Sequence, residues 1–237
     1  MRPGSARAKS RKRGGLPGAP LWLASSSPRR RSLLREHGYR FRWVRPGVDE
    51  TVPGHLAADR AALAIARRKA EQVARSLGSR APGVVLAADT IVAAGNRLLG
   101  KANNPDEARR TLALLSGTTH RVVTGVCLIE IPTMRRALFR VVTRVTMRRW
   151  TGREIANYVR SGEWRGKAGA YAIQESADRF VTRIAGSFTN VVGLPMERVA
   201  RELRKLGISA EPRRARGRAI DRNSESRSVS TRARRPR

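Results

Sequence analysis

Residues 83–101, GVVLAADTIVAAGNRLLGK, decide the fold of this chain. The run from Val84 to Ala88 is continuously apolar, which predicts a strand buried on both faces inside a layered α/β domain. Asp89 and Thr90 interrupt that run. We expect them at the carboxyl end of the strand, where open α/β sheets form their ligand crevices. A turn-forming Asp at a strand end is the alternative interpretation of this position.

A buried carboxylate at Asp89 needs a partner, because burying it alone would cost several kcal/mol. We therefore expect a metal ion, a cation or a bound water beside it. The dipeptide Gly95-Asn96 that follows predicts a hairpin turn. That hairpin would bring Lys101 back toward the crevice.

Composition and charge limit the classes of protein to which this chain can belong. Its 237 residues are 40% hydrophobic, which is enough to bury a sizeable core in one domain or two small ones. The net charge of +32 attracts polyanions such as nucleic acid, acidic membrane surfaces or phosphorylated small molecules. No apolar run approaches the roughly 20 residues of a membrane-spanning helix, so we expect no membrane partner.

The cysteine and histidine content argues against disulfides and zinc sites. Cys127 is the single cysteine, which excludes an internal disulfide and suits a reducing compartment, so we expect a cytoplasmic protein. His37, His55 and His120 are scattered along the chain and lack the spacing of a zinc site.

The two ends differ in composition from the middle of the chain. Residues 1–20 and 209–237 are rich in Arg and poor in large apolar residues, which predicts two basic disordered tails. Between them we expect one domain, residues 21–208. The tails would give the protein weak, non-specific affinity for nucleic acid.

The first strand predicted in the domain leads into a layout that suits phosphate. Residues 21–24 are apolar, and a loop of three serines follows, with Ser27 as a helix cap and Pro28 at the first helical position. Arg29 and Arg30 come next. Amide groups at a helix N-terminus favour an anion, and Arg adds bidentate contacts. The alternative is a capped helix with a basic surface.

The rest of the chain predicts alternating helices and strands. In chain order these are a strand over 41–44, an amphipathic helix over 56–77, a helix from Asn104 to Ser116, strands over 120–131 and 137–147, a helix from Thr151 through Val159, a glycine-rich shaped loop over 162–171, a strand over 180–184 and a closing helix over 191–206.

Lysine is rare in this basic chain, which makes its positions informative. Only six of the 50 basic residues are Lys, and three of these six lie outside the tail and the last helix: Lys69, Lys101 and Lys167. Where most basic positions are Arg, a retained Lys suggests a need for a compact ammonium charge on phosphate. Chance placement is the alternative.

Eight segments together resemble one family. In chain order they are LASSSPRR, VDET, RRKA, LAADTIV, GKANNPDEA, LSGTTHRVVTGV, GKAGAYAIQE and GSFTNVVGLP. Over roughly residues 21–207 the chain resembles the Maf-like nucleoside triphosphate pyrophosphatases. The resemblance implies an elongated mixed α/β fold, similar to the inosine-triphosphate pyrophosphatases, with two lobes around a cleft. It also implies hydrolysis of a nucleoside triphosphate to the monophosphate and pyrophosphate with a divalent cation, Mg or Mn.

The resemblance implies a role for each of ten residues. Asp89 would activate water against the α-phosphorus, Glu50 would bind the metal together with Asp89 or orient the water, and Lys101 would assist the chemistry. The residues implied to bind substrate are Ser25, Arg29, Arg30, Lys69, Thr90, Lys167 and Gln174. The segments SPRR and AYAIQ resemble the branch of the family that acts on dTTP and UTP.

The chain departs from the family pattern at Ala102, Gly166, Ala172 and Glu175. These positions fall in the substrate-side loops, so they bear on base preference more than on reaction type. Two alternatives stay open on the same fold: a basic nucleic-acid-binding protein and a regulator of cell division. Members of the family often form dimers, so a homodimer is also open.

Overall fold

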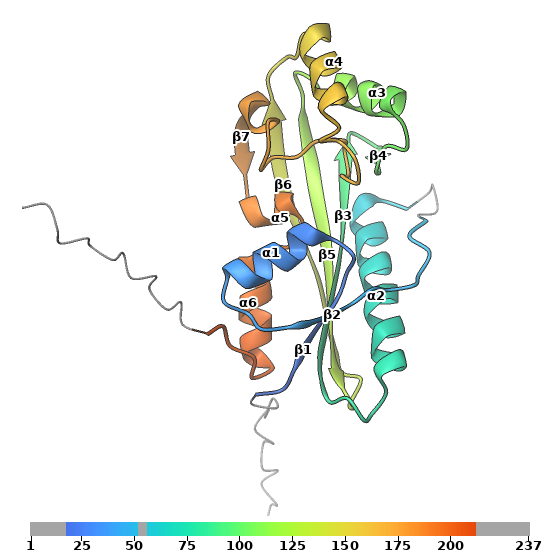
Figure 1. Ribbon diagram of the computed structural model, residues 1–237, viewed down its shortest axis with the longest axis vertical. Coiled ribbons are helices and arrows are strands. Elements are labelled where there is room, and N and C mark those ends of the chain that lie inside the picture. The colour runs from blue at the N-terminus through green and yellow to red at the C-terminus, as the bar shows by residue number, and fades with distance from the viewer. Residues whose placement is uncertain (1–17, 52–55, 212–237) are drawn as a thin grey trace, which may run out of the picture.

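The computed structural model describes residues 18–51 and 56–211. Over these ranges the chain forms one elongated sheet of seven strands with helices on both faces (Figure 1), which confirms the predicted mixed α/β fold. The strands are β1 (Leu21–Ala24), β2 (Arg42–Val44), β3 (Gly83–Ala94), β4 (Arg97–Leu99), β5 (Thr119–Ile131), β6 (Arg136–Met147) and β7 (Val181–Ala185). The helices are α1 (Pro28–Glu36), α2 (Ala58–Leu77), α3 (Pro105–Leu115), α4 (Gly152–Ser161), α5 (Phe188–Val192) and α6 (Met196–Lys205), with a short 3₁₀ turn, Asp178–Phe180.

The sheet order is β2-β1-β3-β5-β6-β7, and β4 pairs with the far end of β3. β1 runs parallel to β2 and β3, whereas the pairs β3–β4, β3–β5, β5–β6 and β6–β7 are antiparallel. The long strands β3, β5 and β6 form the spine of the molecule. The hairpin predicted at Gly95-Asn96 is confirmed as the turn between β3 and β4.

One prediction about the central strand is wrong. β3 does not end at Asp89 but continues to Ala94, because β5 pairs with it without interruption from Gly83 to Ala93. The neighbour that does end here is β1, whose last residue, Ala24, lies opposite Ala87. The crevice therefore opens where the parallel neighbour stops, and Asp89 projects from the middle of a continuous strand.

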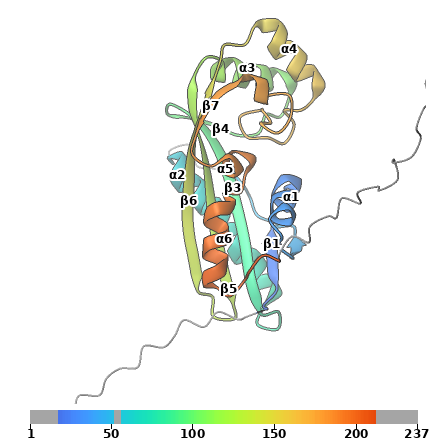
Figure 2. The same ribbon diagram turned by 90° about the vertical axis from the view of Figure 1, so that its left-hand side faces the viewer.

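Helices cover the two faces of the sheet in different ways (Figures 1 and 2). On one face α2 packs small side chains, such as Ala66 and Ala70, against β3 and β5. On the other face the core contains Leu33 and Leu34 of α1 and Leu203 of α6. The helices α3 and α4 lie together at the opposite end of the long strands from α1 and α6, which gives the two predicted lobes.

A glycine in β5 allows α2 to lie very close to the sheet. A Cβ built on Gly125 would stand 2.4 Å from the carbonyl carbon and oxygen of Ala62 in α2. Any side chain at this position would push the helix away. An isolated glycine inside a strand pattern often marks such a close backbone approach.

The helix ends confirm most of the predicted caps. The Ser27 side chain accepts a hydrogen bond from the Arg30 amide, and Thr151 and Glu154 form a full capping box. The closing helix predicted for most of 191–206 is confirmed as α6, but the start of that range belongs to a separate short helix, α5. Gly193, with φ +126°, and Pro195 lie between them, and proline cannot continue a helix.

No helix in the described ranges is long and apolar enough to cross a membrane. Most of the two predicted tails, residues 1–17 and 212–237, lies outside those ranges, so the tails and the domain limits 21–208 stay predictions.

Candidate active site

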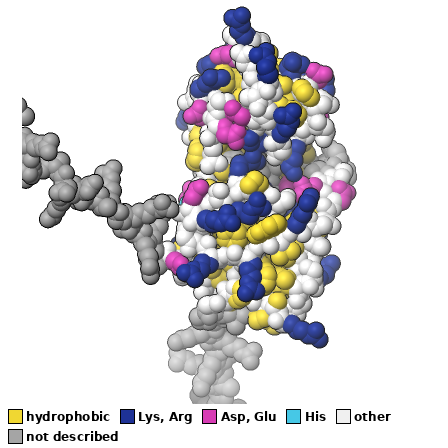
Figure 3. All heavy atoms as spheres, in the orientation of Figure 1, with side chains coloured by type: hydrophobic (Ala, Val, Ile, Leu, Met, Phe, Trp, Pro, Cys, Tyr) yellow, Lys and Arg dark blue, Asp and Glu magenta, His cyan; other side chains and the backbone are white. Residues whose placement is uncertain are grey.

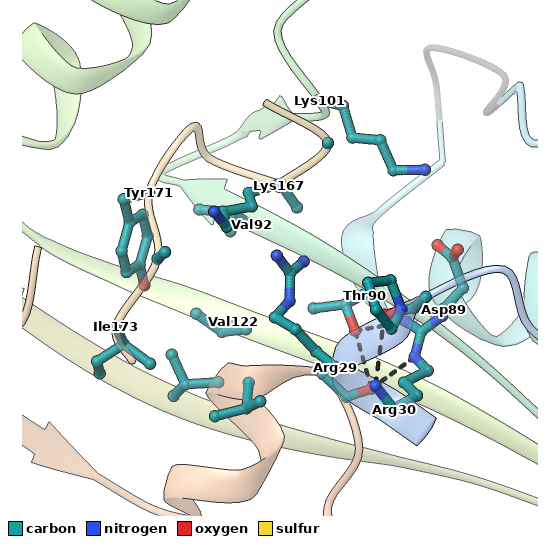
Figure 4. Close-up of a pocket in the computed structure, with 18 of the residues that line it drawn as sticks. Arg29, Arg30, Asp89, Thr90, Val92, Lys101, Val122, Lys167, Tyr171 and Ile173 are labelled. Carbon is teal, nitrogen blue, oxygen red and sulfur yellow. Dashed lines mark hydrogen bonds between the residues drawn. The ribbon is translucent and has the colours of Figure 1, made fainter. Parts of the chain in front are cut away.

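A cavity of about 460 Å³ opens beside Asp89, between α1 and the loop that follows α4. All ten residues implied by the sequence line it: Ser25, Arg29, Arg30, Glu50, Lys69, Asp89, Thr90, Lys101, Lys167 and Gln174. Figure 4 shows Asp89 and Thr90 on one side of the cavity and Lys167 on the other. We call residues 69, 89 and 90 the sheet wall, because α2 and β3 carry them, and residues 165–175 the loop wall.

The sheet wall places two carboxylates around one ammonium group. Lys69 Nζ lies 2.7 Å from Asp89 Oδ1 and 2.8 Å from Glu50 Oε1. Lys101 Nζ lies 3.1 Å from Glu50 Oε2. Lys69 and Asp89 are both buried, whereas the Lys101 side chain is 57% exposed. Of the three partners predicted for Asp89, the structure contains the cation.

The local fold explains how Lys69 reaches Asp89. Lys69 lies on the face of α2 that carries Ala66 and Ala70, whose small side chains let the helix approach the sheet. Gly125, the residue directly opposite Asp89 in β5, has no side chain that would keep α2 away from the sheet. The short distance between helix and strand is what allows the Lys69 ammonium to reach a strand carboxylate.

Glu50 is fully ionised at neutral pH. Burial by itself would raise its pKa, but the hydrogen bonds and charges of Lys69 and Lys101 outweigh burial and lower the pKa of Glu50 to about 2. Its carboxylate is therefore available as an acceptor or as a metal ligand throughout the physiological pH range.

The two carboxylates suit a metal ion that binds together with phosphate. Glu50 and Asp89 are hard oxygen donors, and each uses one oxygen for Lys69. The described residues contain no group of three or more His, Cys, Asp or Glu side chains that could hold a metal. Mg²⁺ commonly binds one or two protein carboxylates and completes its shell with water and substrate phosphates. The donor set fits such an ion.

Arg30 lines the cavity, and groups of the protein already bind its guanidinium. Its guanidinium is buried and donates to three groups of the protein: the Gly193 carbonyl at 2.8 Å, Thr90 Oγ1 at 3.0 Å and Ser25 Oγ at 3.4 Å. Burial lowers its pKa, and the charge of Asp89 partly offsets this. Arg30 thus joins α1, β3 and the turn after α5 underneath the cavity. In contrast, Arg29 is only partly buried and extends into the cavity (Figure 4).

The loop wall holds its shape through unusual backbone conformations. Gly166 and Gly169 have φ values of +68° and +71°, and Ala170, which is not a glycine, has φ +57°. The Gly169 amide donates to the Gly100 carbonyl at 3.0 Å, and Lys101 forms an isolated β-bridge with Ala168. The loop wall is therefore attached to the end of the β3–β4 hairpin.

Lys167 is paired within the loop wall. Its ammonium donates to the Glu163 carbonyl and lies 3.0 Å from the Glu175 carboxylate. Glu175 replaces a frequent family glycine, and its charge also raises the pKa of Arg29, partly opposing the lowering that burial causes. The cavity thus contains a second acid–base pair, which the sequence pattern alone did not reveal.

Several lining residues were not among the predictions. Val92, Val122, Ile173 and Val192 make one part of the cavity apolar, together with Tyr171, as Figure 4 shows in part. The sequence does not single them out, because an apolar residue in a strand, helix or loop looks the same whether it faces a core or a ligand.

His120 supports Tyr171 from below. Its Nε2 lies 2.9 Å from the Tyr171 hydroxyl, and the two rings meet edge to face. Burial lowers the pKa of His120 to about 4, so the ring is neutral at pH 7. Both residues belong to segments quoted for the family resemblance, but no spacing rule connects positions 120 and 171.

The chain is similar in sequence to one family of known proteins. The family model described as "Maf-like protein" matches residues 20–206. The chain belongs to the Maf-like family. A dTTP/UTP pyrophosphatase of Pelotomaculum thermopropionicum is 44% identical over 187 residues, which cover 79% of this chain and 96% of the relative.

Two further relatives carry the same name. The dTTP/UTP pyrophosphatase of Paramagnetospirillum magneticum is 47% identical over 194 residues, covering 81% of this chain and 99% of the relative. That of Rhodopseudomonas palustris is 48% identical over 181 residues, covering 74% and 86%. The similarity covers 96%, 99% and 86% of the lengths of these three relatives, in the order given.

Proposed function

We propose that this Maf-like protein is a nucleoside triphosphate pyrophosphatase that hydrolyses dTTP and UTP to the monophosphate and pyrophosphate. The observation that carries the proposal is the buried Asp89 carboxylate, held 2.7 Å from the Lys69 ammonium inside a cavity lined by further cations. The names of the relatives support the same activity and the same two substrates.

The cations of the cavity would bind the triphosphate. Ser25 precedes the N-terminus of α1, where free amide groups favour an anion, and Arg29 extends from the first turn of that helix. Lys101, exposed at the other side, is free to leave Glu50 for a phosphate oxygen because its ion pair is solvated. The charge on several phosphate oxygens would thus be neutralised before any bond breaks.

Asp89 would act as the general base. It would accept a proton from a water molecule as the water oxygen bonds to the α-phosphorus, while the bond from that phosphorus to the bridging oxygen breaks and pyrophosphate leaves. Lys69 holds the Asp89 carboxylate in place, since its ammonium is itself fixed by two carboxylates at once. General-base assistance of this kind contributes about 10²–10⁴-fold to a rate.

Glu50 and Asp89 would hold a divalent cation, Mg or Mn, jointly with the phosphates. Such an ion, when bound, supplies positive charge against the phosphate oxygens. Glu50 suits this task because its low pKa keeps it ionised without a bound metal.

The apolar part of the cavity would receive the base. Val92, Val122 and Ile173 offer flat apolar contact, and Gln174 carries a paired donor and acceptor that can read the edge of a pyrimidine. Thr90 Oγ1 is held by Arg30 and lies 2.9 Å from Thr124 Oγ1, so its orientation is fixed.

The test is to incubate the full chain with dTTP and Mg²⁺ or Mn²⁺ and to measure the phosphate products. We expect pyrophosphate and dTMP, and little orthophosphate. Asp89→Asn should reduce kcat by about 10²–10⁴-fold, and it should fold because Lys69 keeps Glu50 as a partner. The matched control is Asp106→Asn, an exposed residue at the start of α3, which should keep full activity. An unchanged rate in Asp89→Asn would exclude Asp89 as the base.

Three further expectations from the sequence stay proposals: a cytoplasmic location, assembly as a homodimer, and weak binding of nucleic acid by the tails. A substrate panel of common and modified triphosphates would show how far the departures at Gly166 and Glu175 change base preference.

A further inference from the structure

The folded part of the chain is itself strongly basic. Of the 50 Lys and Arg residues 34 lie in the described ranges, with 16 of the 18 Asp and Glu residues, so these ranges carry a net charge of +18. Residues 29–45 contain seven Arg and one Glu, a net charge of +6 in 17 residues. One third of the net charge of the described ranges is therefore concentrated on α1 and β2.

The outer side of α1 and the segment at β2 pair arginines with aromatic rings. The Arg31 guanidinium lies 4.9 Å from the centroid of the Trp43 ring, and the Arg35 guanidinium 5.5 Å from the centroid of the Phe41 ring. Figure 3 shows dark blue and yellow side chains side by side over α1. We call these four residues the Arg–aromatic ladder.

The ladder has a regular step. Arg31 and Arg35 are one helical turn apart, about 6 Å along the axis of α1. Phe41 and Trp43 are two residues apart in an extended segment, about 6.6 Å. Two pairs, each of one guanidinium and one aromatic ring, therefore follow each other along the surface. This spacing suits a polymer in which each unit carries one negative charge and one flat ring.

The ladder is available for a ligand. Trp43 is 52% exposed, the largest exposed fraction among the exposed large apolar side chains of the described ranges. Neither Arg31 nor Arg35 forms a salt bridge with a carboxylate in those ranges. The positive charge of both groups is thus unneutralised within this part of the protein. β2 is also the edge strand of the sheet, so no neighbouring strand covers this side.

We propose that the Arg–aromatic ladder binds single-stranded nucleic acid. Positively charged grooves with aromatic side chains are the general device for such ligands, because phosphates meet the cations and unpaired bases stack on the rings. A duplex hides its base faces, so it would use the charge but not the rings. An acidic membrane surface would be attracted by the same charge, but it offers nothing flat to stack on Trp43.

The ladder is separate from the cavity. Arg31, Arg35, Phe41 and Trp43 do not line it, whereas Arg29 and Arg30, on the neighbouring positions of α1, do. Helix α1 thus faces a small anion at its N-terminus and a polymeric anion along its outer side. The binding proposed here does not depend on the nucleotide hydrolysis proposed above.

The experiment titrates the full chain with a short fluorescein-labelled single-stranded DNA and follows anisotropy and tryptophan fluorescence. Trp150 and Trp164 are buried and Trp22 is partly buried, so Trp43 is the most exposed tryptophan, and the part of the quenching that Trp43→Ala removes is assigned to it. We expect Trp43→Ala to weaken binding at least about fivefold and to abolish most of the quenching. Trp43→Phe should keep the affinity within about twofold while the quenching is lost.

Charge is tested with a matched pair of double variants. Arg31→Ser with Arg35→Ser should weaken binding and lower the slope of log K against log salt by about 1.4, because each single-strand phosphate contact contributes about 0.7. Arg153→Ser with Arg160→Ser removes the same charge from exposed positions of α4 and should change affinity by less than about twofold. The circular dichroism spectrum and thermal unfolding of each variant serve as the check that it folds.

The outcomes separate the explanations. Unchanged affinity in Trp43→Ala, or equal losses in both double variants, would mean that charge in general or the tails bind the DNA, and the proposal would be wrong. Binding of the duplex as tightly as the single strand would also overturn it. So would Trp43 quenching by phosphatidylserine vesicles without quenching by the single strand, since the surface would then face a membrane.

Discussion

The two walls of the cavity are built on different principles. The sheet wall uses a continuous strand and a helix, and its groups are fixed by buried ion pairs around Lys69. The loop wall uses no regular element, and left-handed backbone conformations at Gly166, Gly169 and Ala170 set its shape. A wall of regular elements suits chemistry that must stay constant, while a loop can change its side chains without disturbing the sheet. We therefore expect damage to the sheet wall to reduce kcat and damage to the loop wall to change KM.

The largest effect is expected for Lys69→Met. This change leaves the buried Asp89 carboxylate without its cation, so the free energy of unfolding should fall by about 3–5 kcal/mol. The loss of charge at the phosphates should lower kcat by about 10²–10³-fold. Urea denaturation and pyrophosphate release measure the two effects. Lys205→Met, which removes a lysine paired with Glu202 on α6, should cost less than about 1 kcal/mol and keep full activity.

A smaller effect, confined to the loop wall, is expected for Gly169→Ala. The new Cβ would stand 2.9 Å from Val92 Cγ2, and alanine at φ +71° is strained. We expect the KM for dTTP to rise about tenfold, as about 1–2 kcal/mol of strain displaces the loop, with kcat changed much less.

Gly166→Ala is the matched control for this loop variant. Gly166 has a similar φ of +68°, but no atom lies within 4 Å of its built Cβ. It should therefore show only the backbone strain and a smaller rise in KM. Equal effects in the two variants, or a loss of kcat alone in Gly169→Ala, would contradict the division of labour between the walls.

The stability of the protein should depend on pH through His120, which contacts Tyr171 of the loop wall. Because its pKa in the folded protein is about 4, below the ordinary value of 6.5, protonation favours the unfolded chain. This contribution to stability is complete above pH 6.5, is lost as the pH falls toward 4, and amounts to about 3 kcal/mol. As the pH falls through this range, the free energy of unfolding of the wild type should drop by that amount more than that of His120→Gln does. If the free energy of unfolding has the same pH dependence in both proteins, His120 is not the group responsible.

The smallest effect is expected for Glu175→Gln. Its carboxylate pairs with Lys167 and is 43% exposed, so stability should change by less than about 1 kcal/mol. Removing this negative charge should lower the KM for dTTP and UTP by about two- to fivefold, since Arg29 and Lys167 would meet the substrate unopposed. Steady-state kinetics at low salt measures the shift. A raised KM would mean that Glu175 itself contacts the substrate.

The sequence predicts the sheet wall better than the loop wall, for physical reasons. A continuous apolar run, a hairpin dipeptide and helix caps are local signals, so β3, the turn at Gly95-Asn96 and the capping box at Thr151 could be read directly. Family resemblance then supplied the residues of the cavity, all of which line it.

Long-range placement could not be read from local patterns. Nothing local shows that β3 continues past Asp89, because β5 supplies the pairing from 28 to 34 residues away. The same holds for Arg30, whose partner Gly193 is 163 positions distant, and for Gly125, whose role depends on where α2 lies. The break between α5 and α6 is the exception, since Pro195 is a local signal for the end of a helix.

The β-bridge between Lys101 and Ala168 has a mechanical consequence for the reaction cycle. One backbone contact couples Lys101, which would bind the triphosphate, to the loop wall, which would contact the base. A shift of the Lys101 backbone would carry Ala168 with it, and a misfitting base that displaces the loop would also displace the backbone from which the Lys101 side chain extends. Binding of the base at the loop wall and binding of phosphate by Lys101 are thereby coupled without a separate moving domain.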